Sequence, residues 1–155
     1  MRRTIFTRLG MDSTSYLREF EQSSMSRGHG YLFDLSLPWP YFPIEEPNAA
    51  NLLCTTVPDM GKFVAELMGP TIIEKRLVDQ MLSPQKAVDR RVSWGLGIAL
   101  YDTQHGRCFW HWGDNADFES YLLGCPEEKV GVVVMTNSSR GRLISREIAA
   151  KALGD

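Results

Sequence analysis

The stretch from Ser93 to Asn137 limits the possible folds of this chain more than any other part of it. Four segments rich in β-branched and aromatic residues follow one another here, separated by short connections that contain Gly or Pro. This pattern predicts an antiparallel meander in which each strand pairs with the next. The expected strands are Trp94–Tyr101, Arg107–Trp112, Phe118–Cys125 and Val130–Thr136.

Helical periodicity appears on both sides of the predicted meander. Thr56 with Asp59 three residues later predicts a helix start, Pro58 suits its first turn, and Gly69-Pro70 ends it. A second helix is expected from about Thr71 to Leu82, and a final amphipathic helix from Arg142 to Leu153. The apolar positions are Met60, Phe63, Val64, Leu67 and Met68 in the first helix, Ile73, Leu77, Val78 and Met81 in the second, and Leu143, Ile144, Ile148, Ala149 and Leu153 in the third. We interpret the first two stripes as core.

The order of these segments predicts one α+β domain spanning residues 1–155, a length that can bury a substantial core. Residues 1–51 have weak periodicity and many Gly and Pro residues, so we expect a loop-rich segment with at most a short strand at Gly30–Leu35. Two helices are then expected in 52–83, the antiparallel meander in 93–137 and the terminal helix in 142–153. A sheet of about four strands with packing helices results.

Charge and hydropathy exclude several classes of function. The chain has 17 basic and 19 acidic side chains, a net charge of -2, and scattered Arg residues, which argues against binding to nucleic acid or to an anionic membrane surface. No apolar run reaches membrane-spanning length, and the basic N-terminus lacks the apolar region of a signal peptide. As written, the chain is expected to stay in the compartment where it is made.

The Cys and His residues do not indicate a metal site or a cofactor. Cys54, Cys108 and Cys125 lack Cys-x-x-Cys spacing, and their odd number does not suggest a disulfide framework. Cys108 and Cys125 lie on neighbouring predicted strands and could be close, but two small buried thiols are the default interpretation. The His residues (His29, His105 and His111) do not have metal-ligand spacing with acidic neighbours.

Six segments in the same order resemble the C-terminal portion of the serine β-lactamase and penicillin-binding-protein-like hydrolases, a group that includes D-aminopeptidase-like and carboxylesterase-like enzymes. The resemblance covers nearly the whole chain. The segments are Leu9-Gly10-Met11 with Thr14, Gly30-Tyr31, Thr55–Met60, Trp94-Gly95-Leu96-Gly97, His111-Trp112-Gly113-Asp114-Asn115 and Val132–Asn137.

The resemblance implies acyl transfer on a small-molecule substrate such as a β-lactam, a peptide or an ester. In the family, a Ser of S-x-x-K attacks the carbonyl, and a K-T-G or H-x-G strand lines the opposite wall. His111, Trp112 and Gly113 then form that wall, and the Asp114 N–H is the candidate oxyanion donor. Asn115 and Asp117 are expected at the rim of the cleft. The alternative is that His111 is an ordinary strand residue, hydrogen-bonded to its surroundings.

The chain also departs from the family pattern. No Y-x-N occurs, and the single S-x-x-K, Ser83-Pro84-Gln85-Lys86, follows the second helix where the family has a surface linker. Pro84 breaks the helical spacing that would stack Ser83 over Lys86. Ala116-Asp117-Phe118 replaces the usual Pro-Gly-Phe, which adds a charge at the expected rim.

Our leading hypothesis is a C-terminal part of a serine hydrolase that lacks its nucleophile and is inactive alone. A second hypothesis is a non-catalytic interaction module that forms a homodimer or docks with a separate N-terminal half. A third is the product of an interrupted reading frame without a selected role. A hydrolase assembled across a dimer is the remaining alternative, and its candidate nucleophiles are Ser13, Ser83 and Ser138.

Overall fold

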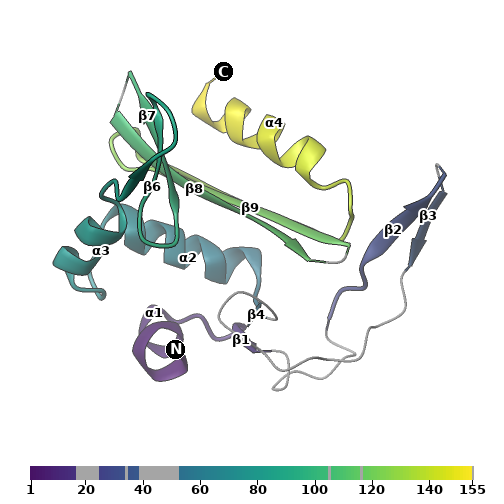
Figure 1. Cartoon of the computed structure of the whole chain (residues 1–155). Helices are drawn as coiled ribbons and strands as arrows, with labels where there is room; N and C mark the ends of the chain where they lie inside the picture. The colour runs from purple at the N-terminus through teal and green to yellow at the C-terminus, as the bar shows by residue number, and fades with distance from the viewer. Residues whose placement is uncertain (17–24, 34, 39–52, 105, 116, 155) are drawn as a thin grey trace.

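The protein, described by a computed structural model, is built around one antiparallel sheet with helices on both faces. The structure describes residues 1–16, 25–33, 35–38, 53–104, 106–115 and 117–154. The sheet has six strands in the order β10-β9-β8-β7-β6-β5, so the predicted meander is present. Helix α2 lies on one face and α4 on the other (Figure 1). This arrangement is the expected α+β fold.

The bounds of the elements follow the chain order. The N-terminal part contains η1 (Arg2–Phe6), α1 (Thr7–Leu9), β1 (Ser15–Tyr16), β2 (His29–Leu32), β3 (Leu35–Pro38) and β4 (Leu53–Cys54). Two helices follow, α2 (Val57–Met68) and α3 (Lys75–Met81). The large sheet contains β5 (Lys86–Ala87), β6 (Val92–Trp94), β7 (Ala99–Thr103), β8 (Gly106–Asn115), β9 (Phe118–Cys125) and β10 (Val130–Thr136), and α4 (Arg142–Leu153) ends the chain.

The segment predicted as one strand over Trp94–Tyr101 is instead two strands joined by a tight turn. Gly97 adopts a φ of 73°, a left-handed conformation that suits Gly and turns the chain. A Cβ on Gly95 would lie 2.0 Å from the carbonyl oxygen of Met81, so this position requires close backbone approach. The period-2 pattern gave no sign of this turn, because the apolar residues continue through it.

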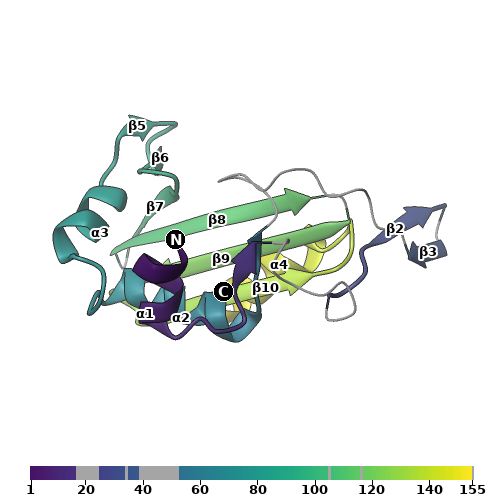
Figure 2. The ribbon, with the colours of Figure 1, turned by 90° about the horizontal axis from the view of Figure 1, so that it is seen from below.

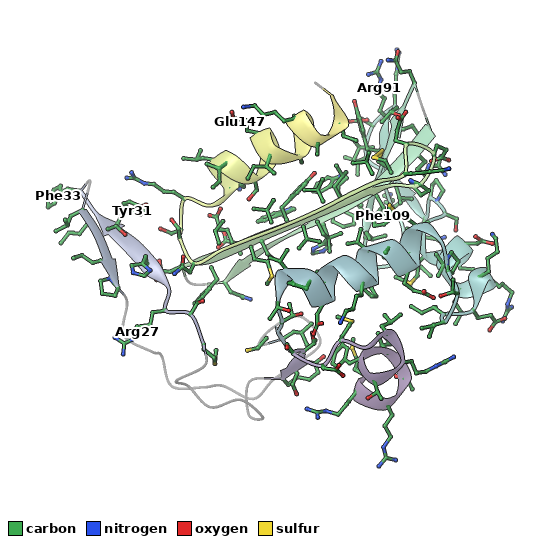
Figure 3. All side chains as sticks on the ribbon, turned by 180° about the vertical axis from the view of Figure 1, so that it is seen from behind. Arg27, Tyr31, Phe33, Arg91, Phe109 and Glu147 are labelled. Atoms are coloured by element: carbon green, nitrogen blue, oxygen red, sulfur yellow. A yellow bond between two sulfur atoms is a disulfide. The ribbon has the colours of Figure 1, made fainter. Side chains whose placement is uncertain are left out.

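Helix α2 confirms the predicted cap and core face. The Thr56 hydroxyl accepts a hydrogen bond from the backbone N–H of Asp59 at 3.4 Å, and the helix ends at Gly69. Val64 and Leu67 are fully buried and pack with residues of α3, β7 and β8 in the main core. Phe109 of β8 lies in the same core, between the sheet and α2 (Figure 3).

Helix α3 begins at Lys75, four residues later than the periodicity predicted. The buried Glu66 carboxylate accepts hydrogen bonds from the backbone N–H groups of Thr71, Ile72 and Ile73 at 2.9, 2.6 and 2.6 Å. These three amides therefore bind a side chain of the preceding helix, in a bent connection before α3. Hydrophobic periodicity could not reveal this competition for the backbone amides.

The default interpretation of Cys108 and Cys125 as two buried thiols is wrong. Both residues are buried as expected, but they form a disulfide with a Cα–Cα distance of 4.2 Å. The cause is the strand register, because the pairing of Phe109 with Gly124 places Cys108 directly opposite Cys125. Cys54 is the remaining cysteine and keeps a free thiol.

The described part of the N-terminal segment contains several short strands. Strands β2 and β3 form a hairpin that extends away from the sheet, and β1 pairs with β4 beside the start of α2 (Figure 2). The expected short strand at Gly30–Leu35 overlaps β2, which ends at Leu32, and β3 begins at Leu35. The proline- and aromatic-rich stretch 39–52 lies outside the described residues.

Helix α4 covers the sheet with small residues instead of its large apolar ones. Ser145 and Ala149 are buried against the sheet, whereas Leu143, Ile144 and Ile148 are exposed. The helix crosses both β9 and β10. Within the described residues, no helix is long and apolar enough to cross a membrane.

Candidate functional site

The His-x-Gly triplet lies in the second half of β8. The strand continues to Asn115, three residues beyond the predicted end at Trp112. His111, Trp112 and Asp114 are exposed, and Gly113 is half-buried. The predicted wall residues are therefore accessible and belong to a regular strand.

Successive side chains of β8 point to opposite faces of the sheet. Phe109 belongs to the core between the sheet and α2, whereas Trp110 packs with the residues beneath α4. His111 shares the face of Phe109, because side chains two positions apart in a strand point to the same side. His111 thus projects from the α2 face of the sheet, beyond the buried core.

One edge of β8 is unpaired where the triplet lies. Strand β7 pairs with β8 only as far as Trp110, opposite Ala99, whereas β9 continues to pair as far as Asn115. Among the described strands, none pairs with residues 111–115 on the β7 side. This short free edge can accept an extended ligand.

Two observations determine which backbone groups point toward the free edge. The N–H of Asp102 in β7 donates to the Arg91 carbonyl at 2.9 Å, on the side away from β8. The neighbouring Tyr101 therefore directs its backbone N–H and C=O groups toward β8, where its partner is Cys108. The 4.2 Å Cα–Cα distance between Cys108 and Cys125 is typical of a non-hydrogen-bonded pair, so the polar groups of Cys108 point away from β9.

Both observations place the backbone N–H and C=O groups of Cys108 on the β7 side of the strand. Successive residues alternate in a regular strand, so those of Trp110, Trp112 and Asp114 point the same way. The amides of Trp112 and Asp114 lie beyond the last residue paired with β7. They are the two donors that the free edge presents.

Aromatic rings lie beside the triplet. The ring of Trp94 is partly exposed and lies 6.3 Å from that of His111 in an edge-to-face arrangement and 6.5 Å from that of Trp110. On the α4 face, the Arg142 guanidinium lies 5.8 Å from the centre of the Trp112 ring. In the sequence, Trp94 was noted only as part of the Trp94–Gly97 segment, and it was not predicted as a site residue.

The glycine and the rim residues have local structural roles. A Cβ on Gly113 would lie 2.7 Å from the Ser120 hydroxyl of β9, so Gly113 allows close approach of the neighbouring strand. Asp117 adopts a φ of 68° in the turn between β8 and β9, and Asn115 closes that hairpin opposite Phe118. Ala116 and His105 lie outside the described residues.

The three candidate nucleophiles make hydrogen bonds in different parts of the chain. The Ser83 hydroxyl donates to the Gln80 carbonyl at 2.8 Å, at the end of α3, and accepts from Gln85 at 3.1 Å. The Ser138 hydroxyl accepts from the Arg140 N–H at 3.2 Å. The Ser13 backbone N–H donates to Asp59 at 2.8 Å. Within the described residues, no hydrogen bond joins Ser83 to Lys86.

The segment that contains Thr14 and the segment Thr55–Met60, both of which resemble the family, meet around the buried carboxylate of Asp59. Asp59 of α2 accepts hydrogen bonds from the Thr14 hydroxyl at 2.9 Å and from Lys62 at 2.9 Å. Burial tends to raise the pKa of Asp59, but the hydrogen bonds from Lys62, Thr14 and Ser13 outweigh it and lower the pKa. These contacts fix the N-terminal segment against α2, so Asp59 has a structural role.

The described residues contain no group of three or more His, Cys, Asp or Glu side chains placed to hold a metal ion. The triplet itself presents backbone donors, the imidazole of His111 and the aromatic rings beside it. Such a surface can orient a carbonyl group.

Comparison with known proteins gives one family and a set of structural relatives. The family model described as Beta-lactamase matches residues 1–154. No curated protein matches the sequence. The octameric penicillin-binding protein homologue from Pyrococcus abyssi has a TM-score of 0.81 at 23% identity, covering 99% of this chain and 37% of that one.

Two further solved structures give a similar picture. The D-amino acid amidase from Ochrobactrum anthropi SV3 has a TM-score of 0.78 at 23% identity, with coverage of 99% of this chain and 48% of that one. The penicillin-binding protein from Bacillus halodurans has a TM-score of 0.72 at 18% identity, with coverage of 96% and 48%. The present chain thus spans less than half the length of each of these proteins, and the likeness establishes the fold.

Proposed function

The chain belongs to the beta-lactamase family, and from this membership we propose that it provides one wall of an acyl-transfer site in a serine hydrolase. His111, Trp112 and Gly113 form the wall, and the Asp114 amide is one donor of the oxyanion hole. Asn115 and Asp117 lie at the rim. The substrate is a small molecule with an acyl group in a β-lactam, a peptide or an ester.

The observation that carries this proposal is the free edge of β8. The amides of Trp112 and Asp114 point toward it, next to an exposed imidazole. A carbonyl oxygen placed at this edge would accept from a preorganised backbone donor, which stabilises the negative charge that develops in acyl transfer. The imidazole of His111 would contact the substrate on the α2 face.

We propose that the nucleophile and its base come from outside these 155 residues. The chain contains one S-x-x-K and no Y-x-N. Ser83 of that motif caps the end of α3 through the Gln80 carbonyl, and Pro84 separates it from Lys86. A wall with an oxyanion donor can bind and polarise a carbonyl but cannot attack it. The isolated chain is therefore expected to be inactive.

A test of this proposal measures the reaction of the purified chain with a p-nitrophenyl acyl ester, alongside the Ser83→Ala variant. We expect no burst of nitrophenol and turnover at the rate of buffer for both proteins. A burst that persists in Ser83→Ala would overturn the proposal that the nucleophile lies outside the chain. A burst lost in that variant would also overturn it, and would assign the nucleophile to Ser83.

The wall itself is tested by binding of a product-like carboxylate. A short N-acyl amino acid is titrated into 15N-labelled protein, and backbone amide shifts are followed by NMR. We expect millimolar binding with the largest shifts at Trp112 and Asp114, and weaker binding in His111→Ala. Shifts that cluster elsewhere, or equal affinity in His111→Ala, would contradict the assignment of the wall.

A second candidate function is assembly with another chain, either a second copy or a separate chain that carries the nucleophile. The Pyrococcus abyssi homologue is octameric by its description, which supports self-association in this structural group. The exposed apolar residues of α4 support it in this chain. A well-behaved monomer across a wide concentration range in sedimentation would argue against assembly.

A further inference from the structure

Trp94, the last residue of β6, lies beside the candidate wall but is not one of its residues. Its ring is 39% exposed and contacts both His111 and Trp110 of β8. These two contacts and the strand register determine where the ring lies relative to the free edge of β8.

The register of three strands places Trp94 in one row with Trp110. Trp94 pairs with Ala99 of β7, and Ala99 pairs with Trp110 of β8. Paired residues of neighbouring strands share a face of the sheet, so these three side chains start from the same face. Ala99 is fully buried and contributes only a methyl group, so the two indole rings meet across it with their centres 6.5 Å apart.

The second contact shows that the ring of Trp94 lies at the margin of the sheet. Its centre is 6.3 Å from that of the His111 ring, and the two planes are at 69°. His111 and Trp110 are neighbours in β8, so their side chains point to opposite faces. One ring reaches both of them only where no strand lies between β6 and β8. That place is the start of β7, because β7 pairs with β8 only up to Trp110.

The start of β7 is also the start of the free edge toward which the backbone donors of the wall point. Figure 2 shows β6 and β7 beside the first half of β8, and the rest of β8 continuing past them. Trp112 follows Trp110 by two residues, about 7 Å along the strand, a distance that a large side chain can span. The indole of Trp94 therefore borders the free edge at the end nearest the Trp112 amide.

The extent of this edge and the position of the ring are both set within the described residues. Strand β7 begins at Ala99 because the chain turns at Gly97 and passes close to the Met81 carbonyl, to which Leu96 donates at 3.0 Å. The same turn joins β7 to Trp94. The aromatic ring and the free edge are thus two consequences of one turn.

We propose that Trp94 is a specificity-determining residue, whose indole binds an aromatic or large apolar side chain of the acyl substrate. This inference deepens the proposed function and rests on it, because the substrate carbonyl must be bound at the free edge of β8. The side chain next to that carbonyl would lie along the edge toward the start of β7. There it would cover the exposed part of the Trp94 ring.

The chemistry of this surface favours an uncharged group with a large apolar area. An indole offers a broad apolar face, and a pair of aromatic rings gains further from offset or edge-to-face packing. The ring of Trp94 is held by its contacts with His111 and Trp110, and Trp110 in turn stacks on Tyr121 at 6.3 Å. Because the ring is already placed, a ligand loses little affinity in ordering it.

The test compares two product-like ligands that differ in one side chain, N-acetylglycine and N-acetylphenylalanine, the latter as each enantiomer. Each is titrated into the 15N-labelled chain, and its affinity is measured from the backbone amides of Trp112 and Asp114 by NMR. We expect the better-bound N-acetylphenylalanine to bind about fivefold more tightly than N-acetylglycine, a difference of about 1 kcal/mol. The indole N–H signal of Trp94 should shift with N-acetylphenylalanine and much less with N-acetylglycine.

The measured quantity in the variants is the ratio of the two affinities, because Trp94 also contacts His111 of the wall. Trp94→Ala should bring this ratio close to one, whereas Trp94→Phe, which keeps an aromatic ring, should retain most of it. Tyr101→Ala is the matched control. Tyr101 is 36% exposed, but it lies in β7 opposite Cys108, in the paired part of β8. Its removal should leave the ratio at the wild-type value.

The outcomes separate this inference from the proposed function. Equal affinities in the wild type, a preference that survives in Trp94→Ala, or a preference lost equally in Tyr101→Ala would overturn the role of Trp94 and leave the wall in place. If neither ligand shifts the amides of Trp112 and Asp114, both proposals are overturned. If Trp94→Ala fails to fold, as judged by circular dichroism, the wild-type indole signal decides, and equal shifts with the two ligands overturn the inference.

Discussion

At the scale of single residues, two buried carboxylates hold segments that hydrophobic packing alone would not position. Asp59 fixes the N-terminal segment to α2, and Glu66 binds three successive backbone amides before α3. Burial tends to raise the pKa of Glu66, but hydrogen bonds from Ile73, Ile72 and Thr71 outweigh it and lower the pKa. Both side chains therefore hold their neighbouring segments in the ionised form.

The Glu66→Gln variant is expected to lower the free energy of unfolding by about 1–3 kcal/mol at pH 7, because an amide accepts these hydrogen bonds less strongly than a carboxylate. The pKa of Glu66 is lower in the folded state, so its stabilisation is complete above the ordinary pKa of a Glu and is lost as the pH falls through the folded-state value. The difference from the wild type should therefore shrink in acid. Urea unfolding at pH 7 and near pH 3 measures it.

Glu74→Gln is the control for this experiment, because the Glu74 side chain is largely exposed and its ion pair with Arg76 lies at the surface. Its effect should stay within about 0.5 kcal/mol at both pH values. An equal loss in the two variants, or a Glu66→Gln effect that does not depend on pH, would contradict the role assigned to the buried carboxylate.

Gly95→Ala is expected to destabilise the protein by about 2 kcal/mol or more, because the new methyl group would overlap the carbonyl oxygen of Met81. Leu96 also donates to this oxygen at 3.0 Å, so the backbone cannot move freely. Gly69→Ala serves as the control, since nothing lies within 4 Å of its added Cβ. Thermal unfolding of the two variants compares them. Equal midpoints would show that the turn can relax.

At the scale of elements, β8 and β9 are held together by a full ladder and by a disulfide at one end. The bond between Cys108 and Cys125 closes a loop with a sequence separation of 17 residues. The free edge of β8 lies at the other end of the strand, near Asp114. The disulfide therefore restrains the strand that carries the candidate wall.

Removing the disulfide with Cys108→Ala and Cys125→Ala together is expected to cost about 2–4 kcal/mol, a typical effect for a loop of this size. Thiol titration of the denatured, unreduced wild type should find one thiol per chain, that of Cys54. The Cys54→Ala variant should keep the sensitivity of unfolding to reductant. Three titratable thiols under oxidising conditions, or unfolding that does not respond to reductant, would contradict the bond.

The sequence predicted the elements with strong local signals and missed those set by long-range contacts. The cap at Thr56, the strands from Phe118 to Thr136 and the helix 142–153 depend on patterns within a few residues, and they are confirmed. The turn at Gly95 depends on an approach to Met81, and the disulfide depends on strand register. The sheet face on which His111 lies follows from the alternation of side chains along a strand. The free edge of β8, in contrast, depends on where β7 begins.

At the scale of the whole molecule, the sheet has unequal edges. The β5 edge consists of a two-residue strand in a charged segment, whereas the β10 edge is seven residues long and uncharged. Helix α2 covers one face of the sheet near β10, and α4 covers the other (Figures 1 and 2).

The assembly proposed as the second candidate function leads to a prediction for thermal unfolding. If the folded chain is a dimer and the unfolded chain a monomer, mass action raises the unfolding temperature with protein concentration. For two chains of 155 residues, the expected rise is about 2 °C for each tenfold increase. Melting curves over a hundredfold concentration range measure the effect, and a wild-type midpoint that stays constant across that range would argue against assembly.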